Sequence, residues 1–236
     1  MFHLYFLDSG HHFFKKLSEL IPIFYLDCIG LGLALIIFSI LYKRVTFKGK
    51  LYAFLYSLIF FVCTAFASFL SFKDLYNNWI YDLVPLLLSI PLYFFYRSQA
   101  LTLLSKRINL IAFLAILIVY AITWRRAIDI PFNAEYYLVF ALFIMINSVI
   151  YLFQELNHMT GIETHKKIEF WFIATLFFYA SVCSLLWSVF SYLSSLPVSQ
   201  TKTIIPGLVW SYCHNTILFI QSLVFSLILI WNRKKL

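Results

Sequence analysis

Seven apolar runs, each long enough to cross a lipid bilayer, set the limits on what this chain can fold into. They cover approximately residues 22–42, 51–72, 79–96, 108–124, 136–154, 168–193 and 206–231. A helix of about 20 apolar residues crosses a hydrocarbon core of roughly 30 Å, and a helix satisfies its own backbone hydrogen bonds, as lipid requires. We therefore expect an all-α, polytopic integral membrane protein built as a bundle of seven transmembrane helices.

Composition excludes a soluble domain. Charged residues make up 12% of the chain and hydrophobic residues 63%, whereas soluble domains carry roughly a quarter charged residues. The lipid bilayer is thus the expected partner of most of the apolar surface. The net charge of +8 is spread over the breaks between the runs, where basic residues set membrane orientation. We expect no nucleic-acid partner.

The domain organisation follows from the short breaks between the runs. Residues 1–21 are expected to form an external segment, with a surface-lying amphipathic segment as one interpretation. This segment lacks the basic start, apolar core and cleavage site of a signal peptide. Residues 22–231 then form the seven-helix domain, and residues 232–236 form a basic tail. Neighbouring helices joined by short breaks should pack antiparallel.

Orientation follows from the count of Lys and Arg when alternate breaks are assigned to opposite sides of the membrane. One side collects Lys43, Arg44, Lys48, Lys50, Arg97, Lys106, Arg107, Lys166, Lys167, Arg233, Lys234 and Lys235, and the other collects Lys15, Lys16, Lys73, Arg125, Arg126 and Lys202. The count is twelve against six, and the richer side is normally cytoplasmic. We expect the N-terminus outside and the C-terminus in the cytoplasm.

Apart from Glu169 at the edge of the sixth run, three ionisable residues lie within the runs: Asp27, Asp82 and His214. Such groups are costly in a bilayer unless they face protein or water, and with the orientation above all three lie toward the outer leaflet. Asn215 belongs to the same layer, and Asn78 flanks it. One interpretation is that the acids reach the interface and His214 bonds a neighbouring helix. The other is an outward-facing pocket formed by these five residues.

In such a pocket His214 would pair with Asp82 or Asp27. The pair would bind a polar ligand or a cation, or titrate near neutral pH, since the reference pKa of histidine is about 6.5.

Small and hydroxyl side chains recur at helical spacing and indicate helix-packing faces. The residues expected to pack are Ser181, Ser184, Ser188, Ser191 and Ser195 in the sixth run, Ser57, Thr64, Ser68 and Ser71 in the second, Gly30 and Ala34 in the first, and Ser211, Asn215, Ser222 and Ser226 in the seventh. A polar conduit lined by the second and sixth runs is the alternative. The third run contains Pro85 and Pro91, which remove backbone hydrogen bonds and favour a kink.

Motifs for several chemistries are absent from the sequence. It contains no HExxH, no GxSxG and no phosphate-binding glycine loop. His214 is the sole histidine within a run, which disfavours a haem held by two histidines, and the seventh run lacks a lysine for a retinal Schiff base. We expect no catalytic residue, no metal and no cofactor, and hence no enzyme.

Three stretches carry a resemblance to a known group of proteins: NNWIYDLVPLLLSIPLYFFYRS, IEFWFIATLFFYASVCSLLW and WSYCHNTILFIQSLVFSLILIW. They resemble the seven-helix membrane regions of Bacteroidota proteins, which stand alone without an assigned function or are fused to histidine kinases. The matching positions are Asn77, Asn78, Phe170, Trp171, Trp210, His214 and Asn215. This chain has no kinase domain, so the resemblance implies that any signal passes to a separate protein.

The expected function is therefore a sensor or signal-relay module of a bacterial inner membrane. It would bind a ligand in the outer-leaflet layer and act on a separate partner on the cytoplasmic side or in the membrane. The alternative is a transporter or channel for a small solute, including a membrane effector of a defence or toxin system. A third possibility is an assembly subunit of a membrane complex, in which His214 serves only packing.

Overall fold

The computed structural model describes residues 25–73, 78–124, 134–157, 167–195 and 209–233. Over these ranges the chain forms seven α-helices and one π-helix, with no strand: α2 (Leu26–Leu41), α3 (Lys50–Phe72), α4 (Asn78–Gln99), α5 (Leu103–Trp124), α6 (Ala134–Asn157), α7 (Ile168–Ser195), the π-helix η3 (Val209–His214) and α9 (Asn215–Arg233). The all-α prediction is confirmed for this part of the chain. The external segment 1–21 and most of the basic tail lie outside the described residues.

The helix α5 begins earlier than the apolar run predicts, at Leu103 rather than at residue 108. A reciprocal cap explains the difference. The Ser105 N–H donates to Thr102 Oγ1 at 3.1 Å, and the Thr102 N–H donates to Ser105 Oγ at 3.3 Å. Because these bonds satisfy N–H groups that a helix start leaves open, Lys106 and Arg107 lie in the first turns of α5 and not in a loop.

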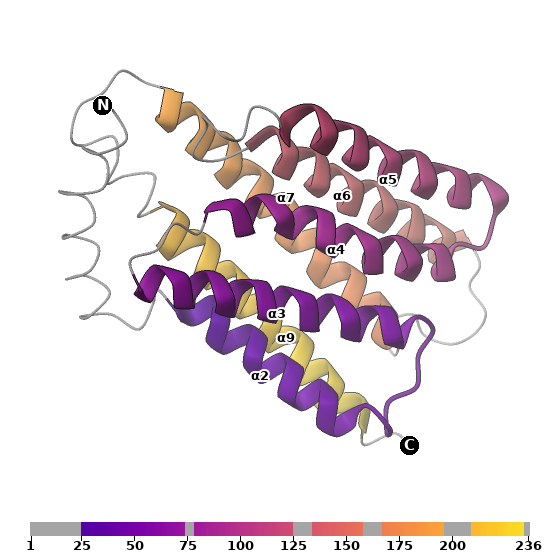
Figure 1. The fold of residues 1–236 in the computed structure, drawn as a ribbon. Coiled ribbons are helices and arrows are strands. Elements are labelled where there is room, and N and C mark those ends of the chain that lie inside the picture. The colour runs from indigo at the N-terminus through magenta and orange to yellow at the C-terminus, as the bar shows by residue number, and fades with distance from the viewer. Residues whose placement is uncertain (1–24, 74–77, 125–133, 158–166, 196–208, 234–236) are drawn as a thin grey trace, which may run out of the picture.

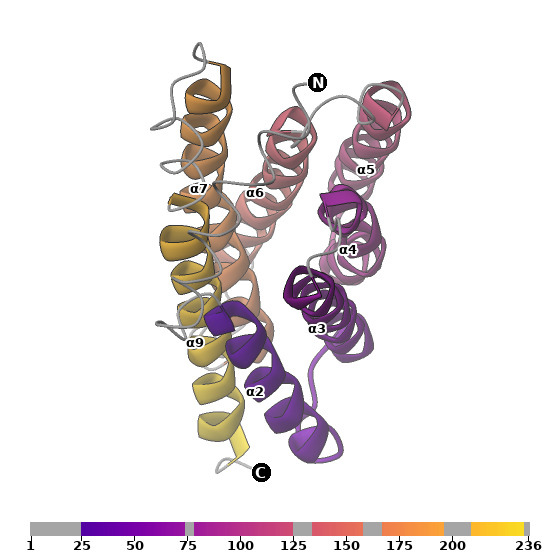
Figure 2. The ribbon, with the colours of Figure 1, turned by 60° about the vertical axis from the view of Figure 1, so that its left-hand side comes forward.

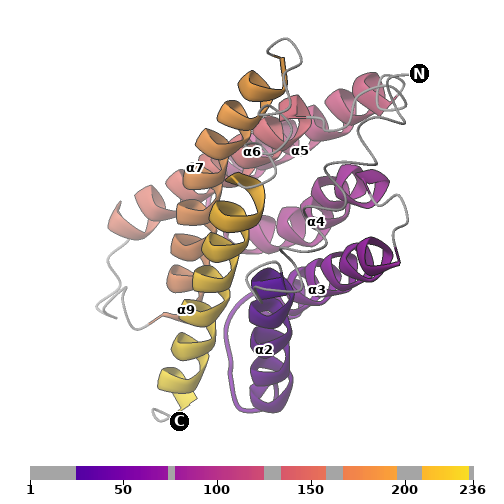
Figure 3. The same cartoon turned by 90° about the vertical axis from the view of Figure 1, so that its left-hand side faces the viewer.

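The seven α-helices form a closed ring in chain order. Each of α2 to α7 packs against the next helix, α7 packs against α9, and α9 returns to pack along α2 (Figures 1 and 2). Contact between α4 and α6 crosses the ring. In Figure 3, α9 lies beside α7, and α2 packs against both α9 and α3.

Basic residues gather at one end of the ring. Nine Lys and Arg residues of the described ranges lie at the end where α2 and α9 finish, and we call it the basic end: Lys43, Arg44, Lys48, Lys50, Arg97, Lys106, Arg107, Lys167 and Arg233. At the opposite end α3 finishes near Lys73 and α9 begins. The orientation of these ends across a membrane stays a prediction.

The outer surface of the ring is apolar. Large hydrophobic side chains on every α-helix are exposed, including Ile40, Phe72, Leu185 and Trp231. Six helices, all except α2, are long and apolar enough to cross a membrane, which indicates a multi-pass membrane protein. The helix α2 has 16 described residues, about 24 Å at the α-helical rise, and the predicted start of its run lies outside the described residues.

Aromatic side chains fill the interior of the ring. Phe172 of α7 lies at its centre, with ring-centroid distances of 4.9 Å to Phe95 of α4, 5.0 Å to Phe225 of α9 and 5.9 Å to Tyr56 of α3. These tilted and edge-to-face contacts are the favourable geometry for aromatic pairs. The Phe172 side chain thereby contacts three other helices, and the four helices share one aromatic core.

Candidate functional site

His214 and Asn215 lie at a junction between two kinds of helix. The π-helix η3 ends at His214, and α9 begins at Asn215. Both side chains are buried, with His214 only 6% exposed. Short π-helical segments are rare and are found frequently at functional sites, because they shift the register of the side chains that follow. The junction is therefore the first place to look for a function.

The hydrogen bonds of His214 reach α7 and its own neighbour. Its Nε2 lies 3.1 Å from the hydroxyl of Tyr179, and its Nδ1 lies 3.4 Å from Oδ1 of Asn215. An amide oxygen only accepts hydrogen bonds, so in this arrangement Nδ1 carries a proton. If the ring is neutral, Nε2 then accepts the hydrogen bond from the Tyr179 hydroxyl. His214 is thus held by contacts at both ring nitrogens.

A chain of aromatic contacts continues from Tyr179 across the ring. The buried Trp187 lies 6.4 Å from Tyr179 and 4.8 Å from Tyr137 of α6, measured between ring centroids. The Tyr137 hydroxyl then donates to the backbone carbonyl of Tyr81 in α4. His214 is connected in this way, through the side chains of Tyr179, Trp187 and Tyr137, to the helix α4 on the far side of the bundle.

The two acids predicted to share this layer have different surroundings. Asp27 is buried in the first turn of α2 and accepts a hydrogen bond from the Cys28 N–H at 2.7 Å. Asp82 is half-buried on α4, within electrostatic reach of Tyr120 and Tyr137. The pairing of His214 with Asp27 or Asp82 stays a prediction.

Asn78, the last of the five predicted pocket residues, is the first residue of α4. Its neighbour Asn77 lies outside the described residues.

Hydroxyl groups of the predicted packing stripe on α7 bond to their own helix. Ser181 donates to the carbonyl of Phe177, Ser184 to that of Ser181, and Ser188 to that of Ser184. Ser188 is exposed, while the first two serines are half-buried. Ser191 and Ser195 belong to α7, but their side chains are outside the described part. In the other stripes, Gly30, Ala34, Ser57 and Thr64 are buried.

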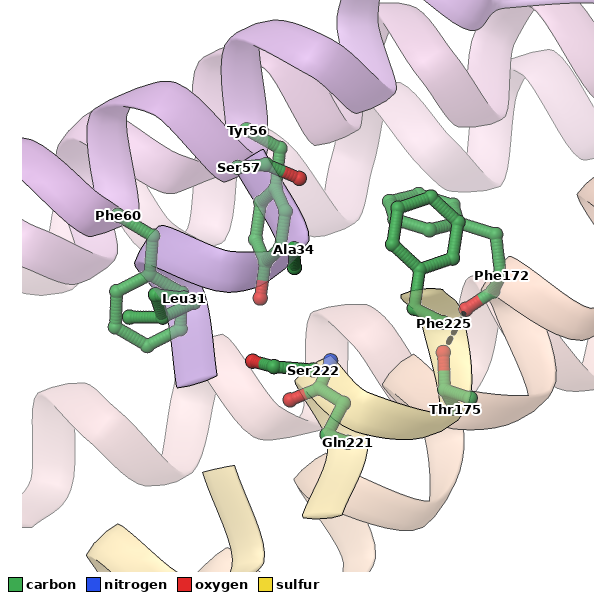
Figure 4. A pocket seen from close by; sticks show the side chains of 10 residues that line it. All are labelled: Leu31, Ala34, Tyr56, Ser57, Phe60, Phe172, Thr175, Gln221, Ser222 and Phe225. Carbon is green, nitrogen blue, oxygen red and sulfur yellow. Dashed lines mark hydrogen bonds between the residues drawn. The ribbon is translucent and has the colours of Figure 1, made fainter. Parts of the chain in front are cut away.

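The interior also contains a small pocket, with polar groups among apolar walls, that the sequence did not suggest. It has a volume of about 20 Å³ and lies inside the ring between α2, α3, α7 and α9 (Figure 4). Its polar groups come from Tyr56, Gln221 and Ser222, with Ser57 and Thr175 beside them.

Sequence reasoning missed Tyr56, Tyr137, Tyr179 and Gln221. The tyrosines were counted with the apolar residues of their runs. Gln221 offered a usable signal, since it is an amide within a run, seven positions after His214 and therefore on the same face of a helix.

Among the described residues there is no group of three or more His, Cys, Asp or Glu side chains that could hold a metal ion. At the basic end, Lys167 forms an ion pair with Glu155. The four cysteines are free, and Cys213 beside His214 is exposed, whereas Cys183 is buried.

Comparisons with protein-family models, with curated proteins and with solved structures found no match to this chain.

Proposed function

We propose that this protein is a signal-relay module of a bacterial inner membrane, with its N-terminus outside and its basic end in the cytoplasm. The observation that carries the proposal is the buried His214–Tyr179 hydrogen bond at the junction of η3 and α9. A stimulus near this junction would change the bond, and a separate partner at the basic end would receive the result. The resemblance to membrane regions fused to histidine kinases supports the same assignment.

The helix α9 supplies the mechanical connection. It runs without interruption for 19 residues from Asn215 to Arg233, a length of about 28 Å. A π-helical turn that converts to α-helix, or the reverse, changes the register of the helix that follows it. Because α9 packs along α2 and against α7, such a change would shift side chains on both neighbours and reach the basic end.

Exchange of backbone amide hydrogens tests this relay in the purified protein in lipid nanodiscs. The variants are His214→Gln and Tyr179→Phe, with Tyr52→Phe as the control, because the Tyr52 ring stacks on Phe94 and its hydroxyl has no hydrogen bond in the described residues. A relay predicts that both variants, but not the control, change exchange several-fold at the basic end as well as around η3. A change confined to η3 and the adjacent part of α7 would contradict the relay and leave His214 a packing role.

Transport is the second candidate, supported by the hydroxyl stripes on α3 and α7. It covers a solute channel and a membrane effector of a defence or toxin system. The hydroxyls of Ser57, Ser181 and Ser184 bond to carbonyls of their own helices, which weakens the case for a continuous polar path. Flux of protons and K⁺ into liposomes that contain the protein would support transport over the relay.

An assembly subunit is the third candidate. It is favoured if a stoichiometric membrane partner co-purifies with the protein and the amide exchange at the basic end is the same in wild type and His214→Gln.

A further inference from the structure

The pocket inside the ring contains two buried polar groups that the protein itself does not satisfy. The Tyr56 side chain is 3% exposed and that of Gln221 is 8% exposed. The two side chains lie within reach of each other, but neither the Tyr56 hydroxyl nor Gln221 Oε1 has a hydrogen-bond partner of ordinary geometry among the described residues. Both groups point into the same space, together with the side chain of Ser222 (Figure 4). A buried polar atom without a partner is unfavourable, so something is expected to bind there.

The volume of the pocket and the side chains that line it indicate what kind of molecule it binds. The cavity of about 20 Å³ exceeds the roughly 10–15 Å³ that one water requires, and a buried water needs two to four polar partners. Leu31, Phe60, Phe172 and Phe225 form the apolar walls, and no charged side chain is among the ten residues that line the pocket. The volume disfavours a larger solute, and the neutral lining disfavours an ion.

We propose that this pocket binds one ordered water molecule that joins α3 to α9. The water accepts a hydrogen bond from the Tyr56 hydroxyl and donates one to Gln221 Oε1. The hydroxyl of Ser222, which lines the same pocket, is the third partner. The donor and acceptor needs of the two protein groups are then met by a single molecule. The inference does not depend on the proposed relay function.

The site has a defined place in the bundle. Gln221 follows His214 by seven residues on the buried face of α9, and Thr175 precedes Tyr179 by one turn on α7. The proposed water therefore lies on the same helix faces as the His214–Tyr179 pair, about 10 Å further along α9. It extends the polar layer around His214 into the middle of the apolar bundle.

A density map of the protein in lipid, at a resolution that shows ordered water, tests the proposal directly. We expect a peak within hydrogen-bonding distance of both Tyr56 Oη and Gln221 Oε1. An empty pocket would overturn the proposal. So would a direct hydrogen bond between the two side chains with no space between them.

A double-mutant cycle gives an independent test by unfolding in detergent. Tyr56→Phe and Gln221→Leu should each lower the unfolding midpoint, and the double variant should lower it by little more than the larger single effect, because either change removes the water. Tyr52→Phe, one turn earlier on α3, is the matched control and should add independently to Gln221→Leu. Additive effects for Tyr56→Phe and Gln221→Leu would contradict a shared water.

Discussion

Pro85 creates a local defect in α4 that a tyrosine of another helix corrects. A helical residue normally donates its N–H to the carbonyl four positions earlier, which for Pro85 is the carbonyl of Tyr81, but proline has no N–H. In the structure the Tyr137 hydroxyl of α6 donates to this same carbonyl at 2.5 Å. Membrane helices tolerate proline where a neighbouring helix supplies such a bond. Tyr137 thus supplies the hydrogen bond that the Tyr81 carbonyl of α4 lacks, and the same bond joins α6 to α4.

This explanation predicts that the effects of changing Tyr137 and Pro85 are coupled. Tyr137→Phe removes the donor and should lower the free energy of unfolding by about 1–2 kcal/mol. In a Pro85→Ala background residue 85 can donate to the Tyr81 carbonyl again, so the same Tyr137→Phe change should have a clearly smaller effect. Equilibrium unfolding in mixed micelles measures both. An equal loss in the two backgrounds would contradict the role assigned to Tyr137.

Tyrosine hydroxyls also show where sequence reasoning is insufficient. The chain has 16 tyrosines, and within an apolar run each looks like any other large ring. The sequence does identify His214 as a buried polar residue that needs a partner. It does not show that Tyr179 is that partner, because the choice depends on how α7 rotates against η3. The same holds for Tyr56 and Gln221, whose relation exists only once α3 and α9 are packed.

Among the elements, the α-helices were the easiest to predict and the π-helix the hardest. Apolar length alone identifies a helix that can cross a bilayer, and each predicted run overlaps one of the α-helices. A π-helical turn has no comparable pattern, because it differs from an α-helix by one inserted residue and is set by packing. The region around Trp210 and His214 was therefore predicted as part of a single helix, whereas the structure divides it into η3 and α9.

The interface between α2 and α9 depends on the absence of a side chain at Gly30. A Cβ atom at this position would lie 2.9 Å from Phe219 Cδ2 and 3.0 Å from Phe219 Cα. The second atom is backbone, so α9 itself would have to move. At Gly32 a Cβ would lie 3.0 Å from Cε2 of the Phe61 ring and would meet no backbone atom, and a ring can rotate away.

Gly30→Ala should therefore destabilise the protein more than Gly32→Ala does. Forcing a methyl group into a packed interface costs typically about 1–3 kcal/mol, and we expect a loss in this range at Gly30 and less than about 1 kcal/mol at Gly32, where only one side chain must adjust. The two substitutions are chemically identical and lie on the same helix, so each controls for the other in a thermal-unfolding comparison. Equal losses would mean that α2 and α9 separate easily at Gly30.

At the scale of the whole molecule, the sequence predicted which consecutive helices are neighbours, but it did not predict that the last helix closes the ring against the first. Short breaks between runs place consecutive helices side by side and antiparallel, and the structure has this order from α2 to α7. The return of α9 to α2 is not a local property. It follows from the fit of Phe219 and Ser222 around Gly30, and no periodicity in the sequence shows which two faces will meet.

The charge distribution leads to a prediction for the orientation of the complete ring. Of the Lys and Arg residues in the described ranges, nine lie at the basic end and Lys73 at the other, and the whole sequence gives twelve against six. Because basic residues are retained on the cytoplasmic side, the basic end should face the cytoplasm and the His214 junction should lie in the outer half of the bilayer.

Cysteine labelling checks this orientation with a matched pair of exposed lysines at helix ends, Lys73 at the end of α3 and Lys106 near the start of α5. The four native cysteines are first replaced by serine, which removes in particular the background from the exposed Cys213. In intact spheroplasts a membrane-impermeant maleimide should label Lys73→Cys, and it should label Lys106→Cys only after the membrane is permeabilised. The reverse result would place the basic end outside. A stimulus at the His214 junction would then have to come from the cytoplasm, and the direction of the proposed relay would be inverted.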